Sequence, residues 1–372
     1  MANLHYSLAG EGRGHAARAR SLVDELRKRH DVTIHTFGDA FSFLAPLYAG
    51  TGVRVEQIPG LRFEYDRRGR VDYLHSTAKN LPVVAQLVRR HRGLVERLRA
   101  ESADLVLCDF EPSLPRAARA AGLPVLAVDH QSVLAFGDLS ELPRHLRRHA
   151  AFLGAFVKRW TPRPTLRVSS SFYRPRLRPG ATEPVRFVGV LLREAVREAI
   201  PTEGDHLLAY VRKGTPAAAL EVLRRAPLPV RVYGRADLAA GGAIQPMTVS
   251  ERGFLDDLAS CKGVVSTAGN QLVGEAIHLG KPVLAMPEPG NREQEINAWF
   301  LDRSGAGISL DFDHLSDRTL ARFVEDLPRL HQRCLQLDVD GTRPTLDLVE
   351  SAMAGALSGS RSTNGTAAAR TA

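Results

Sequence analysis

The chain has 372 residues, of which 44% are hydrophobic and 24% are charged. This composition is typical of a packed globular protein rather than a disordered one, and at roughly 150 residues per domain the length predicts two domains. The three cysteines are scattered and follow no CxxC spacing, which argues against a disulfide framework and against a zinc site. We therefore expect a protein of the reducing cytoplasm.

The net charge of +9 has three candidate causes, which are nucleic acid, anionic lipid and a polyphosphate ligand. No nucleic-acid-binding signature accompanies the arginines, so we expect a basic surface and no nucleic-acid partner. The first residues lack the pattern of a signal peptide, and no apolar run approaches the roughly 18 residues that cross a bilayer. The basic stretch 144–163 also carries Leu153, Phe156 and Trp160. It is consistent with peripheral contact at the cytoplasmic face of a membrane, but we favour an amphipathic helix packed on its own domain.

In the first half of the chain, short apolar runs alternate with longer amphipathic stretches. The pattern predicts strands at 4–10, 31–37, 103–110 and 124–130 and helices at 15–30, 83–100 and 113–122. This alternation is typical of a doubly wound domain with a parallel sheet.

A second series of the same kind follows a proline- and glycine-rich segment. It predicts strands at 206–211, 229–234, 261–267 and 281–287 and helices at 217–226 and 270–280. The sequence therefore predicts an α/β protein with two Rossmann-like domains facing a cleft. The expected divisions are an N-terminal domain at 1–175, a linker at 176–184, a C-terminal domain at 185–357 and a disordered tail at 358–372.

A glycine-rich loop joins the first strand to the first helix and contains Gly10, Gly12 and Gly14. The spacing does not satisfy GxGxxG, so a nicotinamide cofactor with Asp39 on its ribose is the weaker alternative. His15 opens the helix at the edge of the sheet where open parallel sheets bind ligands.

Asp109 ends a later strand at the equivalent edge. We expect it to orient the imidazole of His15, which could then accept a proton from an acceptor hydroxyl. The alternatives are a histidine that only bonds solvent or a carbonyl, an Asp109 that only caps the helix at 113–122, and a competing carboxylate at Glu111.

The segment 266–307 carries the second candidate site. A tight turn from Ser266 to Gly269 precedes a helix, and free N–H groups at a helix start bind phosphate. Glu275 lies one to two turns further on, within reach of ribose hydroxyls, and Glu293 and Gln294 stand where a later helix begins. The alternative for this last pair is a capping cluster on a surface loop.

The order of these residues resembles the nucleotide-sugar motif of the GT-B glycosyltransferases. The likeness is carried by Ser266, Gly269, Glu275, Gly280-Lys281-Pro282, Gln294, Asn297-Ala298 and Gly305-Ala306. It is greatest to the branch that contains the peptidoglycan N-acetylglucosaminyltransferase, and more distant to the plant and macrolide glycosyltransferases of family 1.

This resemblance implies a role for each candidate residue. It implies uracil near Phe254 and Leu255, diphosphate at Ala268, Gly269 and Asn270, ribose on Glu275, and donor-sugar contacts from Glu293 and Gln294. The loop GEGRGH resembles the glycine loop of the family, which adds Gly12 and Gly14 to the donor site and matches its histidine to His15. The family's second glycine loop is replaced by YVRKGTP, so Arg212 and Lys213 are expected to supply charge to the diphosphate instead.

The expected function is that of an inverting glycosyltransferase that moves a hexose-type sugar from a UDP-linked donor to a hydroxyl on a small-molecule or lipid-linked acceptor. We expect no metal and no cofactor, and a monomer or a dimer. The alternatives are a nucleotide-sugar 2-epimerase of the same fold and a non-catalytic protein that binds sugars or polyanions.

Overall fold

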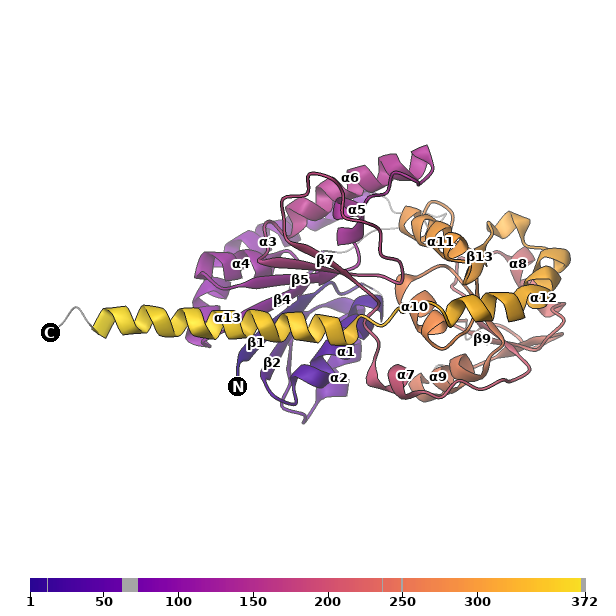
Figure 1. Cartoon of the computed structure of the whole chain (residues 1–372), viewed down its shortest axis with the longest axis horizontal. Helices are drawn as coiled ribbons and strands as arrows, with labels where there is room; N and C mark the ends of the chain where they lie inside the picture. Colours follow the sequence, from indigo (N-terminus) through magenta and orange to yellow (C-terminus); the bar gives the residue numbers. More distant parts are fainter. Residues whose placement is uncertain (12, 62–72, 236, 249, 369–372) are drawn as a thin grey trace.

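The structure is a computed structural model that describes residues 1–11, 13–61, 73–235, 237–248 and 250–368. Two lobes lie side by side, each built on one parallel sheet (Figure 1). The strand order is β3-β2-β1-β4-β5-β6-β7 in the N-terminal lobe and β10-β9-β8-β11-β12-β13 in the C-terminal lobe. The predicted pair of doubly wound α/β domains is confirmed.

The sheet of the N-terminal lobe has its helices on both faces. Its strands are β1 (Asn3–Leu8), β2 (Asp31–Thr36), β3 (Arg54–Gln57), β4 (Leu105–Asp109), β5 (Val125–Asp129), β6 (Leu166–Ser170) and β7 (Val185–Val188). Its helices are α1 (Arg13–Leu26), α2 (Gly38–Tyr48), α3 (Tyr73–Ala100), α4 (Ser113–Ala121), α5 (Ser132–Phe136) and α6 (Arg144–Trp160). Every residue of β4 and β5 is buried, as expected of central strands covered on both faces.

The C-terminal lobe is built on a sheet of six strands, one fewer than the N-terminal lobe has. The longest helices of this lobe come last in the sequence. Its strands are β8 (Leu207–Tyr210), β9 (Val230–Tyr233), β10 (Ile244–Pro246), β11 (Gly263–Ser266), β12 (Val283–Ala285) and β13 (Gly307–Ser309). Its helices are α7 (Glu194–Glu198), α8 (Ala217–Arg224), α9 (Glu251–Ser260), α10 (Asn270–His278), α11 (Arg292–Ser304) and α12 (Asp317–Cys334), with a 3₁₀ turn at Phe312–His314.

The lobes do not divide where the composition predicted. Strand β7 pairs with β6 in the N-terminal sheet, so the predicted linker at 176–184 joins two strands of one lobe and the chain passes to the other lobe after Val188. A proline- and glycine-rich loop marks a break in regular structure, but it does not show which sheet the next strand will join.

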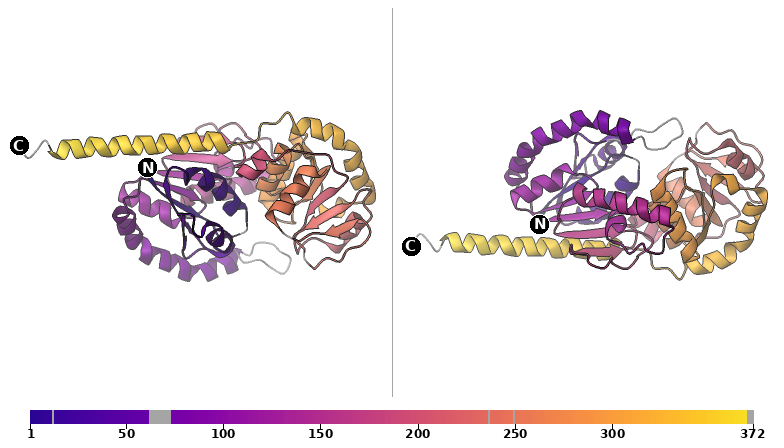
Figure 2. Two further views of the ribbon diagram at one scale, coloured as in Figure 1. Left: turned by 90° about the horizontal axis from the view of Figure 1, so that it is seen from below. Right: turned by 90° about the horizontal axis from the view of Figure 1, so that it is seen from above.

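The C-terminal helix α13 (Thr342–Ala368) returns to the N-terminal lobe. Leu346, Val349 and Met353 are buried in the core of that lobe, and Figures 1 and 2 show the helix running along it. The predicted C-terminal domain at 185–357 therefore loses both its first strand and its last helix to the other lobe. The predicted tail, from residue 358 on, falls within α13 as far as Ala368.

Helix α6 packs against α5 and α11 and buries Leu146, Ala150, Gly154 and Val157. The sequence favoured such a packed helix within 144–163, and α6 packs on its own lobe through α5 and also on the other lobe through α11. None of the helices in the described part of the chain is both long and apolar enough to span a membrane.

Two buried histidines, His5 and His35, should make the free energy of unfolding depend on pH. His5 on β1 and His35 on β2 stack with their Nδ1 and Nε2 atoms 2.9 Å apart, and Glu101, Glu56, Arg54 and Arg97 surround the pair. Burial lowers the pKa of His5 to about 4 and that of His35 to about 3. An unfolded histidine titrates near 6.5, so the unfolded chain binds more protons over this interval and stability is lost as the pH falls from 6.5.

We expect the free energy of unfolding, measured in urea, to fall between pH 6.5 and pH 4, with each of the two histidines adding up to ~1.4 kcal/mol per pH unit. The double variant His5→Asn/His35→Gln should show a shallower slope. His145→Gln, at an exposed position on α6, serves as the control. Equal slopes for all three proteins would contradict the assignment.

Candidate active site

The two candidate sites lie where the strand order of each sheet reverses. Leu8 of β1 is in register with Asp109 of β4, and β8 lies beside β11 in the other lobe. Open parallel sheets bind ligands at the carboxyl ends of the strands at such positions, because the following loops diverge to opposite faces. The sheet topology therefore places His15 and Asp109 at one such crevice, and Arg212 and Gly269 at the other.

His15 and Asp109 form the predicted pair. The Nδ1 atom of His15 lies 2.9 Å from Oδ1 of Asp109, whose side chain is fully buried at the end of β4. A carboxylate can only accept hydrogen bonds, so we assign the proton of the neutral imidazole to Nδ1, which donates to Asp109. Nη2 of Arg18 also lies 3.1 Å from this Nδ1, and with the proton there it donates to Oδ1 of Asp109 instead. In this tautomer the lone pair of Nε2 is available to take a proton. This is the arrangement that a general base requires.

Sequence reasoning missed a third member, Arg18. Its Nε donates to Oδ2 of Asp109 at 2.8 Å, and its Nη2 donates to Oδ1 at 2.9 Å. Burial opposes the charge on Asp109, but Arg18 and His15 outweigh that effect and hold the pKa of this carboxyl below its usual range. The signal in the sequence was the spacing, because residues three apart on a helix share a face and Arg18 follows His15 by three.

Glu111, the carboxylate that the sequence offered as an alternative to Asp109, contacts the start of a helix. Glu111 accepts hydrogen bonds from the backbone N–H groups of Ser113 (2.8 Å) and Leu114 (3.0 Å) at the start of α4. It therefore caps that helix. Asp109 is left to His15 and Arg18, and the capping alternative for Asp109 is wrong.

The glycines of the first loop differ in what they do. A Cβ atom on Gly10 would lie 2.1 Å from the carbonyl oxygen of Phe37, so Gly10 is required by the fold. A Cβ on Gly14, inside α1, would meet no atom within 4 Å. Gly12 lies outside the described residues, so its predicted role has no structural counterpart here.

The turn before α10 is open at the point where the sequence predicts diphosphate. Gly269 is the residue before the helix, and a Cβ on it would meet no atom within 4 Å. In the part of the chain that the structure describes, no side chain caps the first N–H groups of this helix. Ala268 is buried with φ at 59°, a strained conformation for a residue with a side chain. The hydroxyl of Ser266 is buried without a hydrogen-bond partner among the described residues. Such a turn leaves helix N–H groups free for an anion.

Helix α1, which carries His15 in its first turn, packs against α10. Ser21 of α1 and Gln271 of α10 both donate to the carbonyl oxygen of Leu191, at 2.8 and 2.9 Å. The two candidate sites therefore belong to helices that meet across the lobes.

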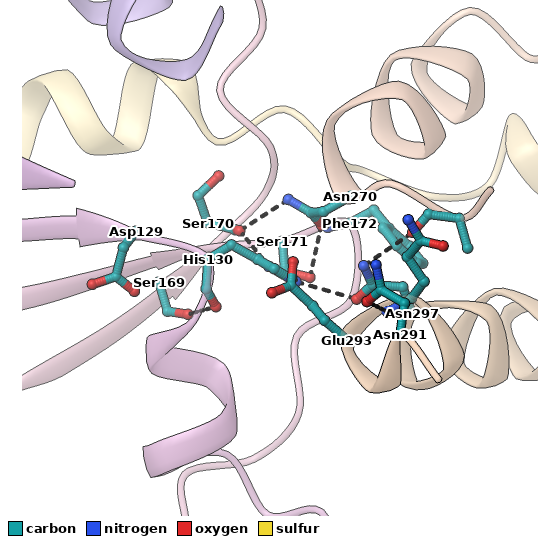
Figure 3. A network of polar contacts seen from close by, with 12 residues as sticks. Asp129, His130, Ser169, Ser170, Ser171, Phe172, Asn270, Asn291, Glu293 and Asn297 are labelled. Carbon is teal, nitrogen blue, oxygen red and sulfur yellow. Dashed lines mark hydrogen bonds and ion pairs between the residues drawn. The ribbon is translucent and has the colours of Figure 1, made fainter. Parts of the chain in front are cut away.

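Asn270 and Asn297 belong to a polar network that joins the turn before α10 to the other lobe (Figure 3). Oδ1 of Asn270 accepts from the Ser171 hydroxyl (3.2 Å) and from the Phe172 N–H group (3.3 Å). Nδ2 of Asn297 donates to the Ala268 carbonyl oxygen at 3.0 Å. The Asn270 side chain is thus a contact between the lobes, and only its backbone N–H group is placed for the predicted diphosphate.

His130 extends this network from the end of β5 and was not among the predicted residues. Its Nε2 lies 3.1 Å from Oδ1 of Asn297 and 4.0 Å from the Glu293 carboxylate, and Figure 3 shows the three side chains directed toward one another. Burial lowers the pKa of His130, so we expect a neutral imidazole at pH 7. The contact joins residues 167 positions apart, which no local pattern reveals.

The predicted donor-sugar residues differ in how free they are. Gln294 accepts from the Glu288 backbone N–H group at 2.8 Å and donates to the Glu288 carboxylate at 3.2 Å. Arg212 pairs with the same carboxylate at 2.9 Å, and Arg212 and Lys213 are both exposed. The structure therefore brings Arg212 to Glu288, in the loop before the helix that carries Gln294.

Glu275, the predicted ribose ligand, is buried and already has two partners. Gln271 donates to it at 3.0 Å and Arg193 at 3.3 Å, and Arg193 also pairs with Glu251 at 2.7 Å. Ribose hydroxyls would have to share this carboxylate with Arg193.

The two predicted base contacts face different surroundings. The ring of Phe254 lies edge-on to Tyr233 (4.9 Å) and to Tyr210 (6.1 Å), at the carboxyl ends of β9 and β8. Leu255 lines a groove of about 680 Å³ between α7 and α9 with Ile200. Phe254 is therefore the better placed of the two for a base.

Comparison with known proteins gives the class of enzyme. The family model described as glycosyl transferase family 1 matches residues 2–328. The chain belongs to this family. Uncharacterized glycosyltransferases from two archaea are similar over 92% of this chain and 96% of their own length, with 23% identity in Methanosarcina mazei and 25% in Methanosarcina acetivorans.

Solved structures confirm the GT-B fold of this glycosyltransferase. MurG from Acinetobacter baumannii superposes with a TM-score of 0.62 at 16% identity, over 94% of this chain and all of MurG. LpCGTa, solved in complex with UDP, superposes with a TM-score of 0.66 at 19% identity, over 95% of this chain and all of LpCGTa.

The open space beside Gly269 predicts a variant of the glycosyltransferase that folds but binds nucleotide poorly. Gly269→Ala adds a methyl group where no protein atom stands in its way, so the melting temperature should stay within a few degrees of the wild type. The Kd for UDP should rise roughly 10- to 100-fold in calorimetry, the cost of disturbing one charged hydrogen bond.

Gly93→Ala is the matched control, since it also adds a methyl group into open space but lies within α3. It should leave the Kd for UDP unchanged and stabilise the protein by about 1 kcal/mol. An unchanged Kd in Gly269→Ala would remove the diphosphate from this turn.

Proposed function

We propose that this glycosyltransferase moves a hexose-type sugar from a UDP-linked donor to an acceptor hydroxyl with inversion at the anomeric carbon. The observation that carries the proposal is the imidazole of His15, held by Asp109 at Nδ1 and without a partner at Nε2 among the described residues, on the helix that packs against α10. The UDP complex of LpCGTa and the dTDP complex of VinC, another protein with this fold, support a nucleotide-sugar donor.

The proposed reaction is a single displacement. Nε2 of His15 takes the proton of the acceptor hydroxyl as its oxygen attacks the anomeric carbon from the face opposite the diphosphate. The bond between the anomeric carbon and the phosphate oxygen breaks, and the nucleoside diphosphate leaves with the electron pair. Attack from the opposite face inverts the configuration.

The leaving group needs its developing charge stabilised. The N–H groups at the start of α10 and the cations of Arg212 and Lys213 are the groups that we assign to this task. We expect no metal and no cofactor to be required for the reaction. Asp109 stabilises the imidazolium that forms on His15, and Arg18 holds both oxygens of Asp109 in place.

A thermal-shift screen of UDP, dTDP and GDP tests the choice of donor. A nucleotide at a hundred times its Kd stabilises the folded protein by about 2.7 kcal/mol, which shifts the melting temperature measurably. With the three nucleotides at one shared concentration, we expect UDP to give the largest shift in melting temperature. A larger shift with dTDP or GDP would overturn the choice of base.

Release of the nucleoside diphosphate separates transfer from the alternatives. The proposal requires that release depend on an acceptor and that the product have the inverted configuration. Release from the donor alone, with a rebuilt epimeric donor, would identify an epimerase instead.

A further inference from the structure

A ladder of aromatic rings begins at the catalytic histidine and ends at the surface. The ring of Phe110 lies nearly parallel to that of His15, at 13° and 6.5 Å between centroids. Trp160 stacks on Phe110 at 5.7 Å, and Phe156 follows at 4.6 Å from Trp160. Phe156 is 38% exposed, so the ladder leads from the proposed base to solvent.

Phe110, the ring next to His15 in the ladder, belongs to a residue with an unfavourable backbone conformation. Phe110 has a φ of 56°, in the left-handed region that costs a bulky residue about 1–3 kcal/mol. The indole Nε1–H group of Trp160 donates to the Phe110 carbonyl oxygen at 2.9 Å and fixes this turn. Phe110 is only partly buried, so core packing does not fully explain a strained aromatic residue directly after Asp109.

The rings offer an apolar surface without a free hydrogen-bond donor. The indole N–H group of Trp160 is the one polar side-chain group in Phe110, Phe156 and Trp160, and the Phe110 carbonyl already accepts from it. The neighbouring cation, Arg116, is already engaged, because its terminal nitrogens donate to the carbonyl oxygens of Pro112, Trp160 and Arg159, each at 2.7 Å. A saccharide needs hydrogen bonds that these rings do not supply.

We propose that this ladder binds the acceptor, and that the acceptor is a hydroxylated planar ring compound. Aromatic rings interact favourably when they stack with an offset on another flat ring. A planar acceptor would extend the row of parallel rings that His15 and Phe110 begin. A phenolic hydroxyl at the inner end of the ladder would then face the imidazole. This inference rests on the proposed function, because it takes His15 as the base.

The test measures acceptor binding alone, so that it does not depend on turnover or on the identity of the donor sugar. Calorimetry with the full chain gives the Kd values of naphthol, methyl glucoside and octanol, which represent a planar ring, a sugar and an alkyl chain. We expect naphthol to bind at least tenfold more tightly than the other two. The chain has two tryptophans, so Trp299→Phe leaves Trp160 as the fluorescent reporter, and naphthol should quench it.

Phe156→Ala should weaken naphthol binding about tenfold, the order of magnitude expected for one lost ring contact. Phe152→Ala is the matched control, because Phe152 is 63% exposed on the same helix but contacts His149 instead of the ladder. Tighter binding of methyl glucoside or octanol, or equal effects of the two variants, would overturn the inference. Absence of any nucleotide-sugar binding would instead overturn the proposed function and leave the naphthol result standing.

Discussion

Replacing His15 by alanine is expected to lower kcat for sugar transfer by about a thousandfold and to leave the Kd for UDP unchanged. A positioned general base contributes roughly 10²- to 10⁴-fold to a rate, and His15 is the group whose free nitrogen we assign to that task. Its side chain is 16% exposed at the start of α1, so the variant should fold. The measurement is the release of nucleoside diphosphate at saturating donor and acceptor, with UDP binding measured by calorimetry.

His145→Ala on α6 is the control for this experiment, because that side chain is largely exposed. It should turn over at the wild-type rate. A His15→Ala enzyme that keeps the wild-type kcat would show that another group takes the proton.

Replacing Asp109 by alanine is expected to destabilise the protein as well as inactivate it. The carboxylate is fully buried and pairs with Arg18, whose side chain is 5% exposed. Removing one partner of a buried ion pair leaves the other charge uncompensated, which costs about 3–5 kcal/mol. The free energy of unfolding in urea should fall by this amount, and transfer activity should be lost because His15 is no longer oriented.

The double variant Asp109→Leu/Arg18→Met separates the two effects. It removes both buried charges, so much of the stability should return while the activity stays lost. The exposed pair Arg343 and Asp347 supplies the comparison, since Asp347→Ala should change the stability by less than about 1 kcal/mol. A stable Asp109→Ala protein would mean that Arg18 finds another partner or water.

The pairing of His15 with Asp109 could be predicted from the sequence for a physical reason. His15 comes after one apolar run that becomes a parallel strand, and Asp109 ends another. The carboxyl ends of such strands meet at one edge of a sheet. Arg18 could not be assigned in the same way, because on an amphipathic helix it resembles any other charged residue. Only the depth of the Asp109 carboxylate in the fold shows that Arg18 must neutralise it.

The sequence could not predict which segments belong to which lobe, or which residues make contacts between the lobes. Strand β7 and helix α13 join the N-terminal lobe through pairing and packing with residues far along the chain. The contact of His130 with Asn297 depends likewise on how the lobes are placed. Local patterns report the period of an element, whereas these features depend on tertiary structure.

The crystal structure of the UDP complex tests the central claim most directly. We predict the diphosphate within hydrogen-bonding distance of the backbone N–H groups of Gly269 and Asn270, with Nε2 of His15 facing the same cleft. A diphosphate bound away from the start of α10, or a His15 imidazole that cannot reach the cleft beside it, would contradict the account.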